Sequence, residues 1–105
     1  MRLDTLQARS RNLALLERYG PLLTDHQQVV LDLYLRSDWS LAEIANHVST
    51  SRAAVHDIVK RSTTALEDYE RRLGLLGEAG RRRRKVASLE HELAGLKRRI
   101  AQLEV

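Results

Sequence analysis

Apolar residues recur three and four positions apart along most of the chain, and no segment alternates strictly between apolar and polar residues. The first spacing indicates amphipathic helices, whereas strict alternation would indicate strands. We therefore expect an all-α fold. A first helix is expected over residues 2–18, ended by Gly20-Pro21. Its apolar stripe is formed by four leucines: Leu3, Leu6, Leu13 and Leu16.

Two Ser/Thr residues, each followed three positions later by Gln or Glu, predict the starts of the next two helices. Thr24 with Gln27 and Ser40 with Glu43 have the spacing of capping boxes. The helix after Thr24 should end near Ser37-Asp38. Its predicted buried positions are Val29, Val30, Leu33 and Tyr34. Those of the helix after Ser40 are Leu41, Ile44, Ala45 and Val48, and Trp39 should pack on Ile44 as a hydrophobic staple.

A long fourth helix should open at Ser51 and run to residue 74 or 76. Its predicted apolar face comprises Val55, Ile58, Val59, Leu66, Tyr69, Leu73 and Leu76. Three glycines follow, at 74, 77 and 80, and each costs a helix about 1 kcal/mol relative to Ala. We therefore expect a hinge at 77–80 that separates a helical domain, 1–76, from a tail, 77–105.

The tail repeats apolar residues at alternating intervals of three and four, which is the heptad pattern of a coiled coil. The predicted seam is Val86, Leu89, Leu93, Leu96, Ile100 and Leu103. It spans fewer than three heptads, or about 27 Å at ~1.5 Å per residue, so the helix would be marginal alone. It could pair with a second copy in a homodimer, fold back on the first or fourth helix, or dock on another protein.

Residues 40–61 have the pattern of a helix-turn-helix motif. Two short helices that cross around a tight turn need a small residue at their contact, and Ala45 supplies it. The inward apolar positions are Ile44, Val48, Val55 and Ile58. The turn position usually holds Gly, which accepts a left-handed backbone, so we expect Ser49 to alter or strain the turn. An ordinary helical hairpin is the alternative.

The second helix of this motif is the candidate recognition helix. Arg52 could bind guanine O6 and N7 with both arms of its guanidinium, and Ser51 with the amides of the first turn could hold a phosphate. Lys60 and Arg61 suit the backbone of a nucleic acid. The candidate contacts are Ser51, Arg52, Ala53, His56, Lys60 and Arg61. Asp57 opposes them and leaves a net charge of +2 on 51–61, so a packing-only role is the alternative.

The excess positive charge of the chain lies in its tail. Residues 1–77 balance ten basic against ten acidic residues, whereas 78–105 hold eight against four. Five adjacent cations dominate: Arg81, Arg82, Arg83, Arg84 and Lys85. Such a run could neutralise several phosphates and give binding that depends steeply on salt. The alternative is a flexible, solvated linker.

The sequence has no pattern typical of a metal site, a cofactor site or a catalytic site. There is no Cys, and the four histidines have no partner at metal-ligand spacing: His26, His47, His56 and His91. No phosphate-cradling glycine loop or catalytic triad pattern is present. We therefore expect no metal, no cofactor and no enzymatic activity. The absence of Cys suits a reducing cytosol and residues 1–4 do not open an apolar run like that of a signal peptide, so we expect a cytoplasmic protein. No stretch approaches the roughly 20 apolar residues of a membrane span, so we expect none.

Residues 19–76 resemble a small bacterial family, the YlxM-type helix-turn-helix proteins. The matching stretches are YGPLL (19–23), TDHQQVVLDLY (24–34), DWSLAEIA (38–45), SRAAV (51–55) and DIVKRSTTALEDYE (57–70). The resemblance implies a fold like the promoter-reading fourth region of sigma factors. It also implies a regulatory role in the signal recognition particle pathway, because the family's genes lie beside the gene for the particle's GTPase. The family usually ends soon after the long fourth helix, so we expect 78–105 to lie outside it.

Three functions follow from these observations as hypotheses. The first is a nucleic-acid-binding regulatory protein that binds the RNA or the GTPase of the signal recognition particle. The second is a sigma-like DNA-binding transcription regulator. The third is an adaptor with no nucleic-acid role that holds a protein partner through its coiled coil and its fourth helix.

Overall fold

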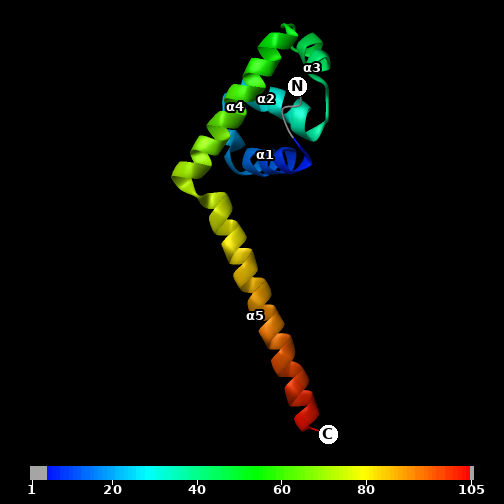
Figure 1. Ribbon diagram of the computed structural model, residues 1–105, viewed down its shortest axis with the longest axis vertical. Helices are drawn as coiled ribbons and strands as arrows, with labels where there is room; N and C mark the ends of the chain where they lie inside the picture. The colour runs from blue at the N-terminus through cyan, green and yellow to red at the C-terminus, as the bar shows by residue number, and fades with distance from the viewer. Residues whose placement is uncertain (1–4, 105) are drawn as a thin grey trace. The chain divides into compact units, whose positions relative to one another are not determined.

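The computed structural model describes residues 5–104, and in that range it contains helices and turns without a strand (Figure 1). The elements are α1 (Leu6–Tyr19), η1 (Gly20–Leu22), α2 (Asp25–Leu31), η2 (Asp32–Arg36), α3 (Leu41–His47), α4 (Arg52–Leu73) and α5 (Leu75–Leu103). The expected all-α helix-turn-helix fold is confirmed. The chain divides into two compact units, one that ends at Gly74 and one that begins at Leu75.

Helix α1 buries the face around its C-terminal end. Thr5 caps the helix by accepting the backbone N–H of Ala8 at 3.1 Å. The expected apolar stripe was partly wrong, because Leu6 in the first turn is 87% exposed, whereas Leu3 lies outside the described residues. The buried side chains are Leu15, Leu16 and Tyr19. As predicted, the α-helix stops before Pro21, and the chain continues in the short 3-10 turn η1.

The second helical segment changes from an α-helix to a π-helix part-way along its length. The capping box of Thr24 and Gln27 is present, as predicted. After Leu31 the chain continues as a π-helix, η2, which adds about one residue per turn and so rotates the following side chains. The buried side chains are Val30 and Leu31 in α2 and, after the rotation, Leu35 in η2. The predicted Val29 is 45% exposed, and Leu33 and Tyr34 are only half-buried.

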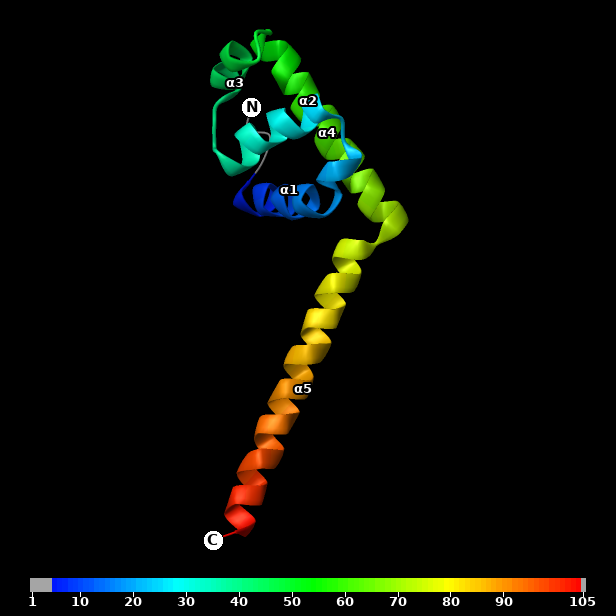
Figure 2. The same ribbon diagram turned by 180° about the vertical axis from the view of Figure 1, so that it is seen from behind.

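Helix α4 is the element on which the other helices of the first unit pack. Helices α1, α2 and α3 all contact it, and Figures 1 and 2 show the three arranged along its length. Val55, Val59 and Leu66 carry the contact and are at most 4% exposed. Ile58 and Tyr69 are half-buried, whereas the predicted Leu73 is exposed because it lies in the last turn.

Polar contacts attach α1 to the C-terminal half of α4. The Arg11 guanidinium donates to both carboxylate oxygens of Glu67, at 2.7 and 2.9 Å. This hydrogen bond lowers the pKa of Glu67 and raises the pKa of Arg11. The Tyr19 hydroxyl donates to Glu70 at 2.6 Å. The apolar contact and these bonds together fix the direction of α1 against α4.

The break between α4 and α5 lies at Gly74, not at the hinge expected over 77–80. Gly74 has φ +65°, a left-handed conformation that glycine adopts without steric cost, and its N–H donates to the Glu70 carbonyl at 2.8 Å. Residues 77–80 are helical and belong to α5. Gly77 and Gly80 lower the helix propensity of α5 without interrupting it, whereas the left-handed backbone of Gly74 ends α4.

Helix α5 has no buried residue among those that the structure describes. The six predicted seam residues share one face of this helix by their spacing, and all are exposed, with Leu96 the least exposed at 48%. A continuous apolar face of this kind lacks a partner in the described chain.

Ser62 provides a test of the packing against α4. Its hydroxyl is fully buried and has no hydrogen-bond partner among the described residues. We predict that Ser62→Ala raises the free energy of unfolding by about 1 kcal/mol, because an unpaired buried hydroxyl is costly and Ala favours helix. Chemical denaturation at fixed protein concentration measures the change. Ser10→Ala, at an exposed position of α1, controls for propensity, and an equal gain in both variants would contradict the prediction.

Candidate nucleic-acid interface

The turn between α3 and α4 has the geometry of a helix-turn-helix. Ser49 has φ +57°, so it occupies the left-handed position that the sequence pattern assigned to it. The Thr50 N–H donates to the Ala45 carbonyl at 3.0 Å, which closes the end of α3 in a Schellman arrangement. At the start of α3, the capping box of Ser40 and Glu43 is present as predicted, and hydrogen bonds from Ser40 lower the pKa of Glu43.

Buried contacts hold α3 and α4 together on either side of this turn. Ile44 and Val55 are fully buried and Ala45 is 5% exposed, as the motif requires. Val48 and Ile58 are half-buried at the edge of the contact. The two helices contact each other directly. The motif therefore holds the first turn of α4 in place.

The first turn of α4 faces solvent. Ser51 caps the helix by accepting the Ala54 N–H at 3.0 Å, which leaves the amides of Arg52 and Ala53 without an intrahelical acceptor. The side chains of Arg52 and Ala53 are exposed, and His56 is half-buried one turn later. Exposed amides at a helix N-terminus beside an Arg can hold an anion such as a phosphate.

An ion pair along α4 changes the charge of this face. The Arg61 guanidinium donates to the Asp57 carboxylate, at 2.8 Å from Nε. The hydrogen bond from Arg61 lowers the pKa of Asp57 and raises the pKa of Arg61. The two charges cancel locally, so Arg52 and Lys60 supply the excess positive charge of the face. This pair was not predicted from the sequence, although Asp and Arg four residues apart in a helix are its ordinary signal.

The basic run lies in α5 and is helical, which excludes the flexible-linker alternative in this structure. At 3.6 residues per turn, Arg81, Arg82, Arg83 and Arg84 point in four directions around the axis, and Lys85 returns close to the direction of Arg81. Arg82 donates to Glu78 at 2.8 Å. We call these five cations the basic collar. They belong to the second unit, whereas the α4 face belongs to the first.

All the Tyr and Trp residues belong to the first unit, and their side chains are buried or half-buried. Tyr19 is buried, and its ring centroid lies 6.2 Å from that of the half-buried Tyr69. Trp39 meets His47 edge-on with ring centroids 5.3 Å apart. The staple between Trp39 and Ile44 stays a prediction.

Within residues 5–104 no cluster of three or more His, Asp or Glu residues is arranged to hold a metal ion. In the same range, no helix has both the length and the apolarity to cross a membrane.

Comparison with known proteins identifies the family. The family model described as "Putative helix-turn-helix protein, YlxM / p13 like" matches residues 6–105. The chain belongs to this family, named UPF0122. Its description is that of helix-turn-helix proteins. The match also corrects the expectation that the family ends near residue 76, because it includes the basic collar and the whole of α5.

Several UPF0122 relatives align over most of this chain. The protein of Symbiobacterium thermophilum is 47% identical over 79 residues, which are 75% of this chain and 74% of that protein. A protein of Clostridium kluyveri is 53% identical over 73 residues, 70% of this chain and 66% of its own length. A protein of Streptococcus suis is 42% identical over 78 residues, 74% of this chain and 69% of its own length.

The left-handed Ser49 generates a prediction about the turn. A residue with a Cβ costs roughly 1–2 kcal/mol in this conformation, and glycine avoids that cost. We expect Ser49→Gly to raise the free energy of unfolding by about 1 kcal/mol, measured by thermal or chemical denaturation. Ser37→Gly, at an exposed position with φ −90°, is the matched control and should lose stability. A loss in both variants would show that the turn is not strained.

Proposed function

We propose that this UPF0122 chain is a non-enzymatic regulatory protein that binds nucleic acid. One observation carries the proposal: the helix-turn-helix packing presents the first turn of α4 to solvent, with Arg52 and two unsatisfied backbone amides on it. This turn is the part of a recognition helix that reaches base edges in the major groove. The family match to helix-turn-helix proteins supports the same conclusion.

The two basic regions have different roles in the proposed complex. On the α4 face, Arg52 binds a base edge, and the Ser51 hydroxyl with the adjacent amides binds a phosphate. Lys60, two turns further along the helix, contacts the backbone of the nucleic acid. The basic collar adds attraction to phosphates that does not depend on base sequence. Binding should therefore combine a specific part with a larger electrostatic part.

The biological setting that we propose follows from the resemblance of residues 19–76 to YlxM-type proteins. In this proposal the chain acts in the cytoplasm, in the signal recognition particle pathway, by binding the particle's RNA or its GTPase. We also propose that it acts as a homodimer, because α5 presents an apolar face with no partner among the described residues.

A second candidate is a sigma-like transcription regulator that binds duplex DNA. The geometry of α4 favours this candidate over RNA binding at the same face, because the major groove of A-form RNA is too narrow to admit a helix. A protein adaptor with no nucleic-acid role is the third candidate, and the exposed seam of α5 is the observation that supports it.

Fluorescence anisotropy tests the proposal with labelled signal recognition particle RNA and labelled random duplex DNA, each at two salt concentrations. We expect affinity that falls as salt rises. Arg52→Ala should weaken DNA binding about tenfold or more, since one bidentate base contact is worth ~1–3 kcal/mol, and should affect RNA less. Replacement of all five collar residues by Gln should weaken both. Absence of salt-dependent binding to either ligand would reject the proposal.

The pair of Asp57 and Arg61 generates a second binding prediction. Asp57→Asn removes a negative charge from the α4 face and releases Arg61 to meet a phosphate. We expect tighter binding to duplex DNA and a slope of log affinity against log salt that is steeper by about one. Asp32→Asn breaks a similar pair with Arg36, outside the helix-turn-helix, and serves as the control. Equal affinity of both variants and the unmodified chain would place Arg61 outside the interface.

A further inference from the structure

The heptad frame of α5 is longer than the sequence pattern indicated. Because α5 is helical from Leu75 onward, the heptad frame extends back through Ala79 to Leu75, which is 43% exposed. With the heptad written a to g, the a positions are Ala79, Val86, Leu93 and Ile100. The d positions are Leu75, Arg82, Leu89, Leu96 and Leu103. The frame therefore covers four heptads.

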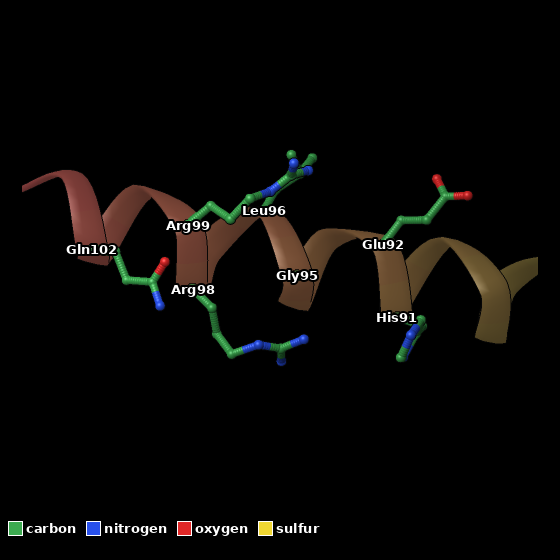
Figure 3. Close-up of a pocket in the computed structure, with 7 residues that line it drawn as sticks. All are labelled: His91, Glu92, Gly95, Leu96, Arg98, Arg99 and Gln102. Atoms are coloured by element: carbon green, nitrogen blue, oxygen red, sulfur yellow. The ribbon is translucent and has the colours of Figure 1, made fainter.

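The charged residues that flank this face follow a regular order. Residues at g lie beside d, and residues at e lie beside a. The g positions are Glu78, Lys85, Glu92 and Arg99, and the e positions are Arg83, Glu90, Lys97 and Glu104. Figure 3 shows one example: Glu92 and Arg99 extend from the same side of the helix as Leu96, whereas His91 and Arg98 extend from the opposite side. Both rows alternate in sign along the helix.

We propose that α5 pairs with α5 of a second copy as a parallel, in-register, two-stranded coiled coil. In that arrangement each g residue meets the e residue five positions later on the other chain. The four resulting pairs are Glu78 with Arg83, Lys85 with Glu90, Glu92 with Lys97, and Arg99 with Glu104. Every pair joins opposite charges, and each occurs twice in a symmetric dimer.

The residues of the seam support the same arrangement independently of the charges. Val86 and Ile100 are β-branched and occupy a positions, whereas Leu occupies four of the five d positions. β-Branched residues at a with Leu at d favour parallel coiled coils of two strands.

Arg82 is the exception at d, where two copies would place like charges opposite each other. Its guanidinium donates to the g residue Glu78 at 2.8 Å, which offsets the positive charge of Arg82. The apolar seam is therefore continuous from Val86 to Leu103, and the first heptad pairs more weakly.

This dimer has a consequence for binding, which rests on the proposed function. A parallel coil begins at the same end in both chains, so it brings two basic collars side by side and tethers two helix-turn-helix units at one end. Two such units suit a nucleic-acid site with two related halves. The pairing itself depends only on α5.

A charge-swap experiment on the full chain tests orientation and register. Glu92→Lys alone and Lys97→Glu alone each make a g–e pair repulsive, and each should raise the dissociation constant of the dimer about tenfold at low salt, since each exposed pair is worth up to ~1 kcal/mol and occurs twice. The variant with both changes has the unmodified chain's composition. In a parallel dimer it restores the pair and should return the dissociation constant to within about twofold.

An antiparallel dimer gives a different result, because e faces e and g faces g. Its charges match when Lys85 faces Glu92 and Glu90 faces Lys97, and the double change then makes both contacts repulsive. Sedimentation equilibrium without nucleic acid measures the dissociation constants, so failure of the proposed binding function leaves this test unaffected. A monomeric unmodified chain, or a double variant weaker than both single variants, would overturn the inference.

A single cysteine gives a direct measure of orientation, because the chain has no Cys of its own. Leu103→Cys places a thiol at the last d position of the frame, where parallel in-register pairing brings the two copies of residue 103 together. We expect a disulfide-linked dimer in a redox buffer at micromolar protein. Ser88→Cys, at an exposed position outside the seam, should cross-link far less. Equal cross-linking of the two variants would contradict parallel pairing.

Discussion

The contact between α3 and α4 across the Ser49 turn is the interaction on which the candidate interface depends. Ile44, Ala45 and Val55 are buried where the helices cross, and the backbone closes the turn through the Thr50 N–H. Without this contact the first turn of α4 would have no fixed direction, and its amides and Arg52 would not form one surface. The rest of the first unit supports the contact by packing α1 and α2 on α4.

The two units of the chain differ in how their charges are balanced. In the first unit most of the charged residues that the structure describes are neutralised locally, as in the pairs of Arg11 with Glu67 and Arg61 with Asp57. The excess positive charge belongs to α5, where the basic collar surrounds the helix near its start. In the proposed function, this division lets one chain combine a modestly charged nucleic-acid-binding face on α4 with attraction of the basic collar to phosphates that does not depend on base sequence.

The seam of α5 and the charges that flank it restrict which helix can pair with α5. Apolar residues at a and d require a partner of some kind, whereas the signs at e and g select which helix and which register fit. A second copy of α5 satisfies both conditions in our proposal. The left-handed Gly74 ends α4, and α5 starts as a separate helix at Leu75.

Local features of the sequence determined where most helices begin and which segment forms the motif. Caps at Thr24, Ser40 and Ser51 act within three residues, so their outcome could be predicted from spacing alone. Tertiary structure decided what local spacing does not contain. In the π-helix η2, Leu35 is buried rather than the predicted Leu33 and Tyr34, and Val29, Leu6 and Leu73 are exposed. The helix breaks at Gly74, which has a positive φ, rather than at Gly77 or Gly80. All three positions are glycine, so the residue type alone does not determine which of them adopts the left-handed conformation.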